Sequence, residues 1–339
     1  FEAEREGTIS HIGLAREADA ILVAPATANT IAKLAYGLAD DLLSTTILAA
    51  RVPVIVCPAM NAKMFEHSAT RKNIEILKTY GYRVIDPDCG VMACGEEGAG
   101  RLPEWEQVAE YVLRDITTSD LTGQSVLVTA GPTREPYDPA RFISNRSSGK
   151  MGYAIARTAF RRGAKVTLIS GPTALQPPAG VEVISVTTAL EMYNAVMDNY
   201  KQASVIVKAA AVADFRCADQ HHQKIKKSES SLNMELVQNP DILKELGNSC
   251  DHEHQLLIGF AAESENIEEE GRRKLKNKKL DLIAVNDISS AASGFEVDTN
   301  QITLIDADRS LKLIHTSKIK TADLLWDHVV GHNLLKPVT

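Results

Sequence analysis

The segment that most constrains the fold is a short apolar run followed by a glycine-containing loop and a helix. Ser125–Ala130 reads SVLVTA, which is short and apolar enough for a buried parallel strand. After the loop, Met151–Arg162 places small and apolar residues on one helical face and stops before Gly163. A strand, a loop and a helix in this order are typical of an α/β protein with a parallel sheet.

The loop between these two elements has properties of a phosphate-binding site. Gly131 and Gly149 allow backbone N–H groups to approach a phosphate closely, and a helix N-terminus favours negative charge. Arg141 and Lys150 add two basic side chains. The GxGxxG and P-loop patterns are absent, so on composition alone the loop could equally be a simple turn.

Length and charge exclude several classes of protein. A chain of 339 residues is long enough for about two domains. Its net charge of −7 argues against sequence-independent binding of nucleic acid. No apolar run reaches the roughly 18–20 residues that cross a bilayer, and five scattered cysteines fit free thiols in a reducing compartment. We therefore expect a cytoplasmic enzyme without a membrane partner. Because the sequence starts at Phe1, we also expect further sequence upstream.

The first domain is expected to span residues 1–116, where strand and helix patterns alternate. Buried strands are predicted at Ala20–Ala24, Val52–Cys57 and Arg83–Ile85, and helices at Thr30–Tyr36, Asp41–Ala50 and Ala69–Tyr80. Ligands of open α/β sheets bind outside the carboxyl ends of the strands. The candidate contacts just after the first two strands are Pro25, Thr27, Asn29 and Asn61. An alternative role for Thr27 or Asn29 is the N-cap of the next helix.

Two more candidates come from the flanks of this domain. His11 lies in a short segment ahead of a helix-like stretch, although a lone histidine is more often structural than catalytic. Ala93–Glu104 is rich in glycine and contains Cys94, which predicts a mobile lid over a substrate. Cys89 and Cys94 lack a second Cys/His pair nearby, so a zinc site is not expected.

This half resembles the flavin-dependent phosphopantothenoylcysteine decarboxylases of coenzyme A biosynthesis. The matching segments, in order and spacing, are HIGLAREADAILVAPATANTIAKLAYGLADDLL, CPAMNAKM and ACGEEGAGRLPE. The resemblance implies a flavodoxin-like fold that binds FMN and decarboxylates 4′-phosphopantothenoylcysteine to 4′-phosphopantetheine. It implies that His11 is the active-site base, that Asn61 binds the substrate carboxylate and that Cys94 returns a proton to an enethiol intermediate. The family's opening strand, loop and helix, which hold the FMN phosphate, are not in this sequence, so we expect an N-terminally truncated domain.

The second domain is expected at residues 121–339, after the polar stretch Thr117–Gly123. The predicted elements are strands at Ser125–Ala130, Lys165–Ser170, Val181–Val186, Val205–Ala209, Leu256–Phe260 and Leu282–Val285, a helix at Ala189–Tyr200 and a late β-pair around Glu296–Asp306. This order predicts a Rossmann-like, doubly wound sheet with an antiparallel addition.

Basic residues gather at two places in this domain. Lys224–Lys227 lies in a polar segment, where three lysines repel one another unless an anion joins them, so we favour a functional role. A second cluster, Arg272–Lys279, follows acidic residues on the same predicted helix and complements the helix dipole. We expect one or two lysines of that second cluster to face a triphosphate.

The second half resembles the phosphopantothenate–cysteine ligase domain, which in bacteria follows the decarboxylase. The matching segments are AGPTREPYDPARFISNRSSGKMG, AAVADF, KIKK, NPDIL, GFAAE and DLIAVND. The resemblance implies that CTP activates 4′-phosphopantothenate as an acyl-cytidylate with loss of pyrophosphate, and that L-cysteine then displaces CMP. Mg²⁺ is the expected metal, with unassigned ligands; Asp214 could orient either cytosine or the metal.

The same resemblance assigns residues to the ligase reaction. Asn145 holds the acyl-cytidylate and Lys224 promotes its formation. The nucleotide-binding positions are Asp214, Asn239, Pro240, Asp241, Phe260, Lys274 and Lys278, with Gly131, Gly149 and Lys150 as the phosphate cradle.

Two other classes compete with this assignment. Two α/β domains suggest an NAD(P)-dependent oxidoreductase, but the GxGxxG pattern with its acidic partner is missing. A non-catalytic, flavodoxin-like regulatory subunit would have no use for His11, Asn61 and Cys94 together. Ligase domains of the family pair as dimers and decarboxylase domains form trimers, so we expect a homo-oligomer.

Overall fold

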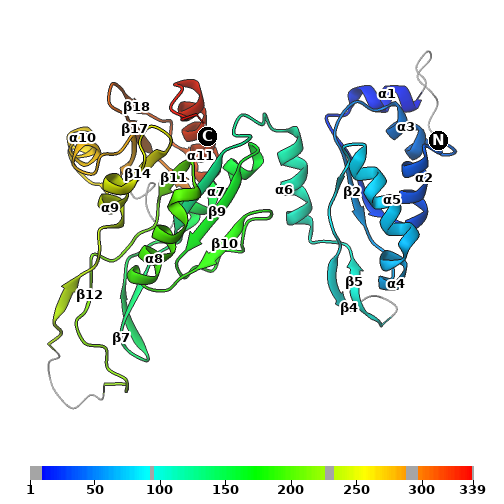
Figure 1. Cartoon of the computed structure of the whole chain (residues 1–339). Coiled ribbons are helices and arrows are strands. Elements are labelled where there is room, and N and C mark those ends of the chain that lie inside the picture. The colour runs from blue at the N-terminus through cyan, green and yellow to red at the C-terminus, as the bar shows by residue number, and fades with distance from the viewer. Residues whose placement is uncertain (1–9, 92–94, 226–232, 288–296, 338–339) are drawn as a thin grey trace. The chain divides into compact units, whose positions relative to one another are not determined.

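The computed structural model describes residues 10–91, 95–225, 233–287 and 297–337. The chain divides into two compact units, Phe1–Thr117 and Thr118–Thr339, which are described separately below (Figure 1). Within the described ranges, no helix is both long enough and apolar enough to cross a membrane.

The first unit is built on a parallel sheet of three short strands. The strands are β1 (Ile21–Ala26), β2 (Val54–Pro58) and β3 (Arg83–Val84), in that order. The helices are α1 (Ser10–Glu17), α2 (Ala28–Tyr36), α3 (Leu42–Ala49), α4 (Ala62–Glu66), α5 (Ser68–Thr79) and α6 (Trp105–Ile116). Ile31, Val56 and Leu77 are fully buried in its core. Every strand and helix predicted in this half is present, with ends shifted by at most a few residues.

Two predictions for the first unit need correction. His11 lies inside α1, not in a segment ahead of a helix. The described part of the glycine-rich stretch forms β5 (Glu97–Arg101), which pairs with β4 (Asp88–Val91) in an antiparallel ribbon, where a mobile lid was expected. Small residues suit this ribbon because a Cβ on Gly98 would lie 2.7 Å from the Cβ of Ala62.

The second unit contains a sheet of eight strands, which confirms the predicted fold class. Across the sheet these are β10 (Glu182–Ser185), β9 (Lys165–Ser170), β6 (Ser125–Ala130), β11 (Val205–Lys208), β14 (Leu256–Glu263), β15 (Leu282–Asp287), β17 (Ile302–Ile305) and β18 (Ser310–Lys312). The strands from β10 to β15 are parallel, and β17 and β18 are antiparallel. Numbered along the chain, the parallel strands follow the doubly wound order 3-2-1-4-5-6, with the switch point between β6 and β11.

Helices cover both faces of this sheet. One face packs against α8 (Ala189–Asn199), α9 (Ile242–Ser249) and α10 (Ile267–Asn277), which bury residues such as Met192 and Leu246. On the other face α7 (Lys150–Arg161) contacts β6 and β9, and α11 (Lys318–Gly331) contacts α7. A single 3₁₀ turn, η1 (Tyr200–Gln202), follows α8.

Three small antiparallel pairs accompany the sheet in the described residues. They are β7 (Arg134–Asp138) with β8 (Arg141–Ser144), β12 (Phe215–Cys217) with β13 (Leu236–Gln238), and β16 (Thr299–Asn300) with β19 (Thr316–Ser317). The first pair corrects the sequence interpretation, since half of the segment taken as a loop forms a hairpin. Its turn is held by Asp138, whose Oδ1 accepts the N–H of Ala140 at 2.8 Å. In Figure 1, β7 and β12 extend away from the main sheet, and the two pack against each other.

Candidate functional site

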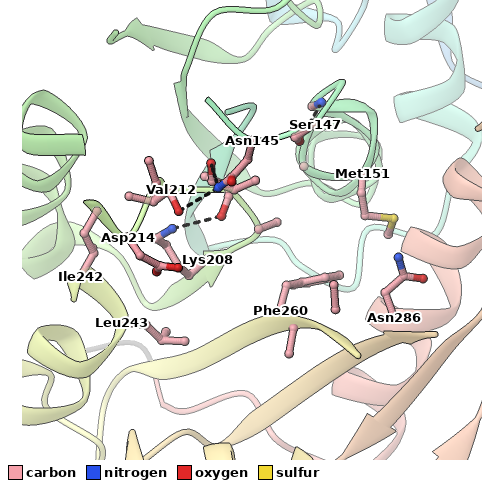
Figure 2. Close-up of a pocket in the computed structure, with 18 of the residues that line it drawn as sticks. Asn145, Ser147, Met151, Lys208, Val212, Asp214, Ile242, Leu243, Phe260 and Asn286 are labelled. Carbon is pink, nitrogen blue, oxygen red and sulfur yellow. Dashed lines mark hydrogen bonds between the residues drawn. The ribbon is translucent and has the colours of Figure 1, made fainter. Parts of the chain in front are cut away.

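A cavity of about 400 Å³ opens at the carboxyl ends of the central strands, beside the switch point. Its walls come from α7, from the segment after β11, from the start of α9, and from β14, β15 and α10. Among the predicted site residues, those that line it are Asn145, Gly149, Lys150, Asp214, Asn239, Pro240, Asp241, Phe260, Lys274 and Lys278. Figure 2 shows Asn145, Lys208, Phe260 and Asn286 arranged around it.

The N-terminus of α7 forms one wall because two glycines allow it to approach the sheet. Gly149 is the N-cap, with a left-handed φ of 77°, and a Cβ there would lie 2.7 Å from Thr173 Cγ2. A Cβ on Gly152 would lie 2.5 Å from that of Ala130 at the end of β6. The N-terminus of α7 therefore lies at a cavity wall, an arrangement that favours an anion.

Side chains fix the carbonyl groups of the strap Ala210–Asp214, which follows β11. Asn145 Nδ2 donates to the carbonyls of Ala211, at 3.3 Å, and Val212, at 3.0 Å. Asn239 Nδ2 donates to the carbonyl of Ala213 at 2.9 Å. Asn145 and Asn239, two of the predicted site residues, thus hold the strap Ala210–Asp214 in place. Each therefore has a structural contact in addition to any ligand contact.

Five lysines line the cavity, namely Lys150, Lys208, Lys274, Lys278 and Lys318. Lys150 pairs with Asp298 at 2.6 Å and Lys278 with Asp241 at 3.1 Å, while Lys274 pairs with Glu263. Lys318 Nζ donates to the Val297 carbonyl at 2.5 Å. This density of positive charge suits a polyphosphate ligand.

The pKa values of two residues that line the cavity, Asp241 and Lys208, are shifted from their ordinary values. Burial alone would raise the pKa of Asp241, but the backbone N–H of Lys244 and the Lys278 ammonium lower it overall. Burial lowers the pKa of Lys208 to about 7, with a smaller contribution from the nearby Lys278 charge. The surroundings therefore disfavour the ammonium form of Lys208 and favour the carboxylate form of Asp241.

Two predicted residues of the ligase domain do not line this cavity. Lys224 is exposed and lies on the segment whose next residue, Ile225, donates its N–H to Asp138 of the β7–β8 hairpin at 3.3 Å. Gly131 instead supports the wall, because a Cβ there would lie 3.0 Å from the carbonyl of Gly171. Lys224 and Gly131 were both predicted to contact the nucleotide directly. Their distance from the cavity depends on how the backbone segments pair, which the sequence pattern does not define.

The lining residues that were not predicted include four with polar side chains that can contact a ligand: Lys208, Asn286, Asn300 and Lys318. Lys208 lies next to the end of a predicted strand and Asn286 directly follows one, so the strand-end rule could have identified them. Asn286 Oδ1 is buried and has no hydrogen-bond partner in the described residues. Asn300 belongs to β16, within the late β-pair predicted around Glu296–Asp306, and Lys318 belongs to α11, a helix that was not predicted.

In the first unit, the P-A-M-N segment contacts the glycine-rich segment. Asn61 Nδ2 donates to Glu96 Oε2 at 2.7 Å, and Lys63 Nζ donates to Glu96 Oε1 at 3.0 Å. These two hydrogen bonds lower the pKa of Glu96, and the bond from Asn61 has the larger effect. Asn61 is also the N-cap of α4. The structure thus brings together two of the three predicted decarboxylase segments.

The remaining candidates of this unit lie at the carboxyl end of β1 or outside the described residues. Thr27 is the N-cap of α2, where its Oγ1 accepts the N–H of Thr30 at 3.2 Å, as the alternative interpretation proposed. Pro25 and Asn29 are exposed at the same edge. Cys94 lies outside the described residues.

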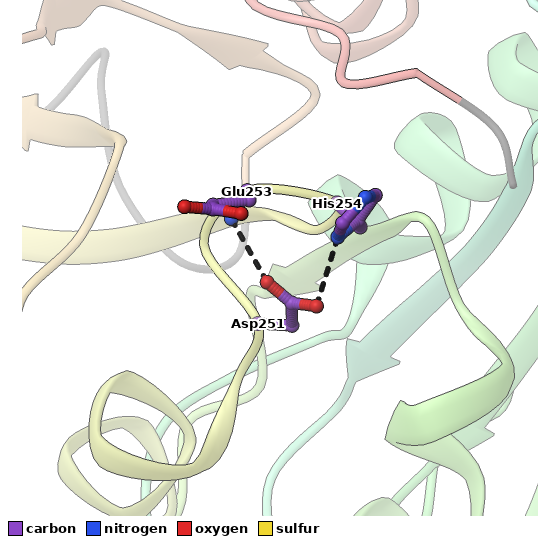
Figure 3. Close-up of side chains that lie close together, drawn as sticks. All are labelled: Asp251, Glu253 and His254. Atoms are coloured by element: carbon purple, nitrogen blue, oxygen red, sulfur yellow. Dashed lines mark hydrogen bonds and ion pairs between the residues drawn. The ribbon is translucent and has the colours of Figure 1, made fainter.

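A separate group of polar side chains, Asp251, Glu253 and His254, lies in the turn before β14 (Figure 3). Asp251 contacts His254 Nδ1 at 2.9 Å and accepts the N–H of Glu253 at 3.1 Å. The two acidic residues are exposed, and their bonds hold the turn. No ligand role follows from these contacts.

The fold and the cavity define an α/β protein in which a Rossmann-like unit with a lysine-rich cavity follows a smaller flavoprotein-like unit. Residues 2–117 match the family model Flavoprotein, and residues 121–332 match that of the DNA/pantothenate metabolism flavoprotein C-terminal domain. The chain belongs to the family of coenzyme A biosynthesis bifunctional proteins, which confirms the resemblance of both halves.

Individual relatives support this membership. The chain is 47% identical over 312 residues to the coenzyme A biosynthesis bifunctional protein CoaBC of Bacillus subtilis (strain 168), covering 91% of this chain and 76% of that protein. It is 44% identical over 331 residues to the protein of the same name from Escherichia coli (strain K12), covering 96% and 81%. A crystal structure of a CoaBC C-terminal domain superposes with a TM-score of 0.55 at 40% identity, covering 64% of this chain and 99% of that one.

Proposed function

We propose that the second unit joins 4′-phosphopantothenate to L-cysteine at the expense of CTP. An oxygen of the substrate carboxylate attacks the α-phosphorus of CTP, and pyrophosphate leaves. The cysteine amine then attacks the acyl carbon, CMP leaves and one proton is released. The product, 4′-phosphopantothenoylcysteine, would be the substrate of the first unit.

The observation that carries this proposal is the lysine-rich cavity at the switch point of the sheet. A helix N-terminus and five lysines, three of them paired with carboxylates, line the cavity and are groups that can stabilise charge developing on phosphate oxygens. The same cavity is lined by Asn145, to which the family resemblance assigns a role with the acyl-cytidylate, and by Asp214, which falls on a nucleotide-binding position of the family. Lys224 would act from the segment beside the β7–β8 hairpin when the ligand is bound.

Mg²⁺ fits the donor groups of this cavity. Magnesium is usually held by one or two carboxylates together with the phosphates of the substrate. Asp214 provides an exposed carboxylate on the cavity wall and is the residue we assign to the metal. When bound, the ion would neutralise charge on the phosphates.

For the first unit we propose FMN binding and decarboxylation of 4′-phosphopantothenoylcysteine. The exposed residues Pro25 and Asn29 at the carboxyl end of β1 would contact the flavin, which supplies the oxidising chemistry. Asn61 would bind the substrate carboxylate through its amide, His11 would accept a proton and Cys94 would return one. Flavin absorption in the purified protein, released on denaturation, tests this part; a colourless protein contradicts it.

We also propose a cytoplasmic homo-oligomer, in line with small water-soluble substrates. Exposed apolar side chains support self-association: Phe142 and Phe215 in the two ribbons of the second unit, and Leu38 and Leu48 in the first. Light scattering of the purified protein tests this, since a monomeric mass at micromolar concentration would rule it out.

The ligase activity predicts pyrophosphate release that requires CTP, 4′-phosphopantothenate and Mg²⁺ together. Lys224→Gln should slow this release about 100-fold or more, because a positioned ammonium stabilises charge in the transition state. A coupled pyrophosphate assay measures the rate. The matched control is Lys165→Gln, which removes an exposed lysine at the amino end of β9 and should leave the rate unchanged. If the wild type consumes no CTP, or if Lys224→Gln is as fast as the wild type, the proposal fails.

A further inference from the structure

Two of the five cavity lysines, Lys208 and Lys318, are almost completely buried, with 7% and 6% of the residue exposed. Lys208 is the last residue of β11 and lies at the centre of the sheet. Its Nζ donates to the carbonyl of Ala210 at 3.3 Å, as Figure 2 shows. Among the described residues, no carboxylate forms an ion pair with this ammonium.

The elements packed around Lys208 do not offer it a free negative charge. The flanking strands β6 and β14 place the neutral Thr129 and Gly259 opposite it in register. The start of α9 contributes Asp241 and the end of α10 contributes Lys278, and these two pair with each other at 3.1 Å. Burial disfavours the ammonium form of Lys208 most, and the Lys278 charge adds to this effect, while Asp241 opposes it only in part.

We propose that Lys208 contacts the phosphates of the nucleotide in this cavity and gains a proton as the nucleotide binds. The inference rests on the proposed binding of CTP. A buried amine beside a lysine-rich wall becomes favourable as a cation only when an anion enters, and a polyphosphate is the anion that the cavity suits. Lys208 is thus a nucleotide-binding residue whose charge depends on occupancy of the cavity.

The expected proton uptake follows from the pKa of Lys208, which burial lowers to about 7 in the free protein. More of the free amine is neutral at pH 8 than at pH 6, so binding that protonates it takes up more protons per nucleotide at pH 8 than at pH 6. Nucleotide affinity should therefore weaken as the pH rises from 7 to 9.

Isothermal titration calorimetry of the full chain with CTP, in the absence of 4′-phosphopantothenate, tests this. Titrations at pH 8 in Tris and in HEPES, which differ in ionisation enthalpy, give the number of protons exchanged. We expect a proton uptake for the wild type that is clearly larger than that of Lys208→Met, and a Kd for the variant that is at least about 10-fold weaker. Lys201→Met, which replaces an exposed lysine in the turn η1 before β11, should behave as the wild type. Equal proton uptake by Lys208→Met and the wild type overturns the proposal.

A titration with inorganic pyrophosphate in place of CTP tests the role of Lys208 independently of the proposed ligase function. If the wild type does not bind CTP, the ligase proposal fails, and the same titration with pyrophosphate decides the role of Lys208. The difference in proton uptake between wild type and Lys208→Met cancels protons exchanged by the ligand itself, and the wild type should again take up more protons than the variant at pH 8. Failure to bind pyrophosphate, or no difference between the two proteins, overturns the inference.

Thermal unfolding distinguishes a binding role from a purely structural one. The lysine pKa is lower in the folded state than the 10.5 of an ordinary lysine, so between pH 7 and 10.5 the unfolded chain binds more protons. The wild type should then gain stability relative to Lys208→Met as the pH rises from 7 to 9, with a difference in Tm that changes by about 5 °C. At pH 6, Lys208→Met should melt no lower than the wild type. A variant several degrees less stable at pH 6 would mean that Lys208 mainly holds the Ala210 carbonyl.

Discussion

Replacing Asn145 by aspartate is expected to slow CTP-dependent pyrophosphate release by about 100-fold to 1000-fold. The amide Nδ2 of Asn145 donates to the carbonyls of Ala211 and Val212 and holds the strap beside the cavity. An ionised aspartate is only an acceptor, so both bonds become repulsive contacts between oxygens. The new negative charge also faces the place where we propose that nucleotide phosphates bind. The measurement is the initial rate of pyrophosphate release under saturating CTP, 4′-phosphopantothenate and L-cysteine.

The fold of the Asn145→Asp variant should persist, because Asn145 is exposed and its substitution costs about 1 kcal/mol. Its thermal unfolding therefore serves as an internal check on the kinetic result. Asn248→Asp is the matched control, since it adds the same charge at an exposed position of α9 and should keep the wild-type rate. A rate for Asn145→Asp within 10-fold of the wild type, with normal CTP affinity, would remove Asn145 from the proposed machinery.

The sequence predicted the sheet of the second unit well because its strands are short apolar runs between turn residues. Ser125–Ala130 and Lys165–Ser170 have the ends that were expected. Such strands are buried on both faces, so local composition alone identifies them. The antiparallel addition and the switch point then follow from the order of the elements.

The helices α9 and α11 were not predicted because their local sequences lack a clear pattern of apolar and polar residues. The helix α11 contains Lys318 and His328, polar residues that the structure buries, so the sequence shows no clean apolar stripe. The helix α9 spans only eight residues and includes Gly247, which a Cβ would bring within 1.9 Å of the Lys278 carbonyl. Tertiary packing, and not intrinsic propensity, explains why these residues are helical.

Whether a candidate site residue lines the cavity depends on what determines its position in the fold. Residues that start a helix, such as Lys150, line the cavity because topology alone determines their position. Asp214 also lines it, at the end of the strap that follows β11. Lys224 does not line it, since its position depends on the pairing of Ile225 with the β7–β8 hairpin. Lys208 was overlooked because burial of its amine depends on contacts from α9 and α10, which are distant in sequence.

The packing of α11 onto α7 links the stability of the second unit to the cavity. Trp326 is fully buried, and its Nε1 donates to the Ile155 carbonyl at 3.3 Å and to Thr158 Oγ1 at 3.1 Å. Both acceptors lie on α7, the helix whose N-terminus forms a cavity wall. Removing the indole therefore leaves a void behind that wall and deprives two buried acceptors of their donor.

Trp326→Ala is expected to destabilise the second unit by about 3–5 kcal/mol and to weaken CTP binding at the same time. The loss of stability follows from the void, and the loss of affinity follows because α7 can then shift away from the phosphates. Urea unfolding followed by far-UV circular dichroism measures the first effect, and calorimetric titration with CTP measures the second. The chain has two tryptophans, so Trp105→Ala is a natural control: Trp105 is 61% exposed on α6 of the first unit, and its removal should change neither quantity. If Trp326→Ala lost the expected stability but bound CTP as the wild type does, the position of α7 would not depend on α11, and the proposed link between this packing and the cavity would be wrong.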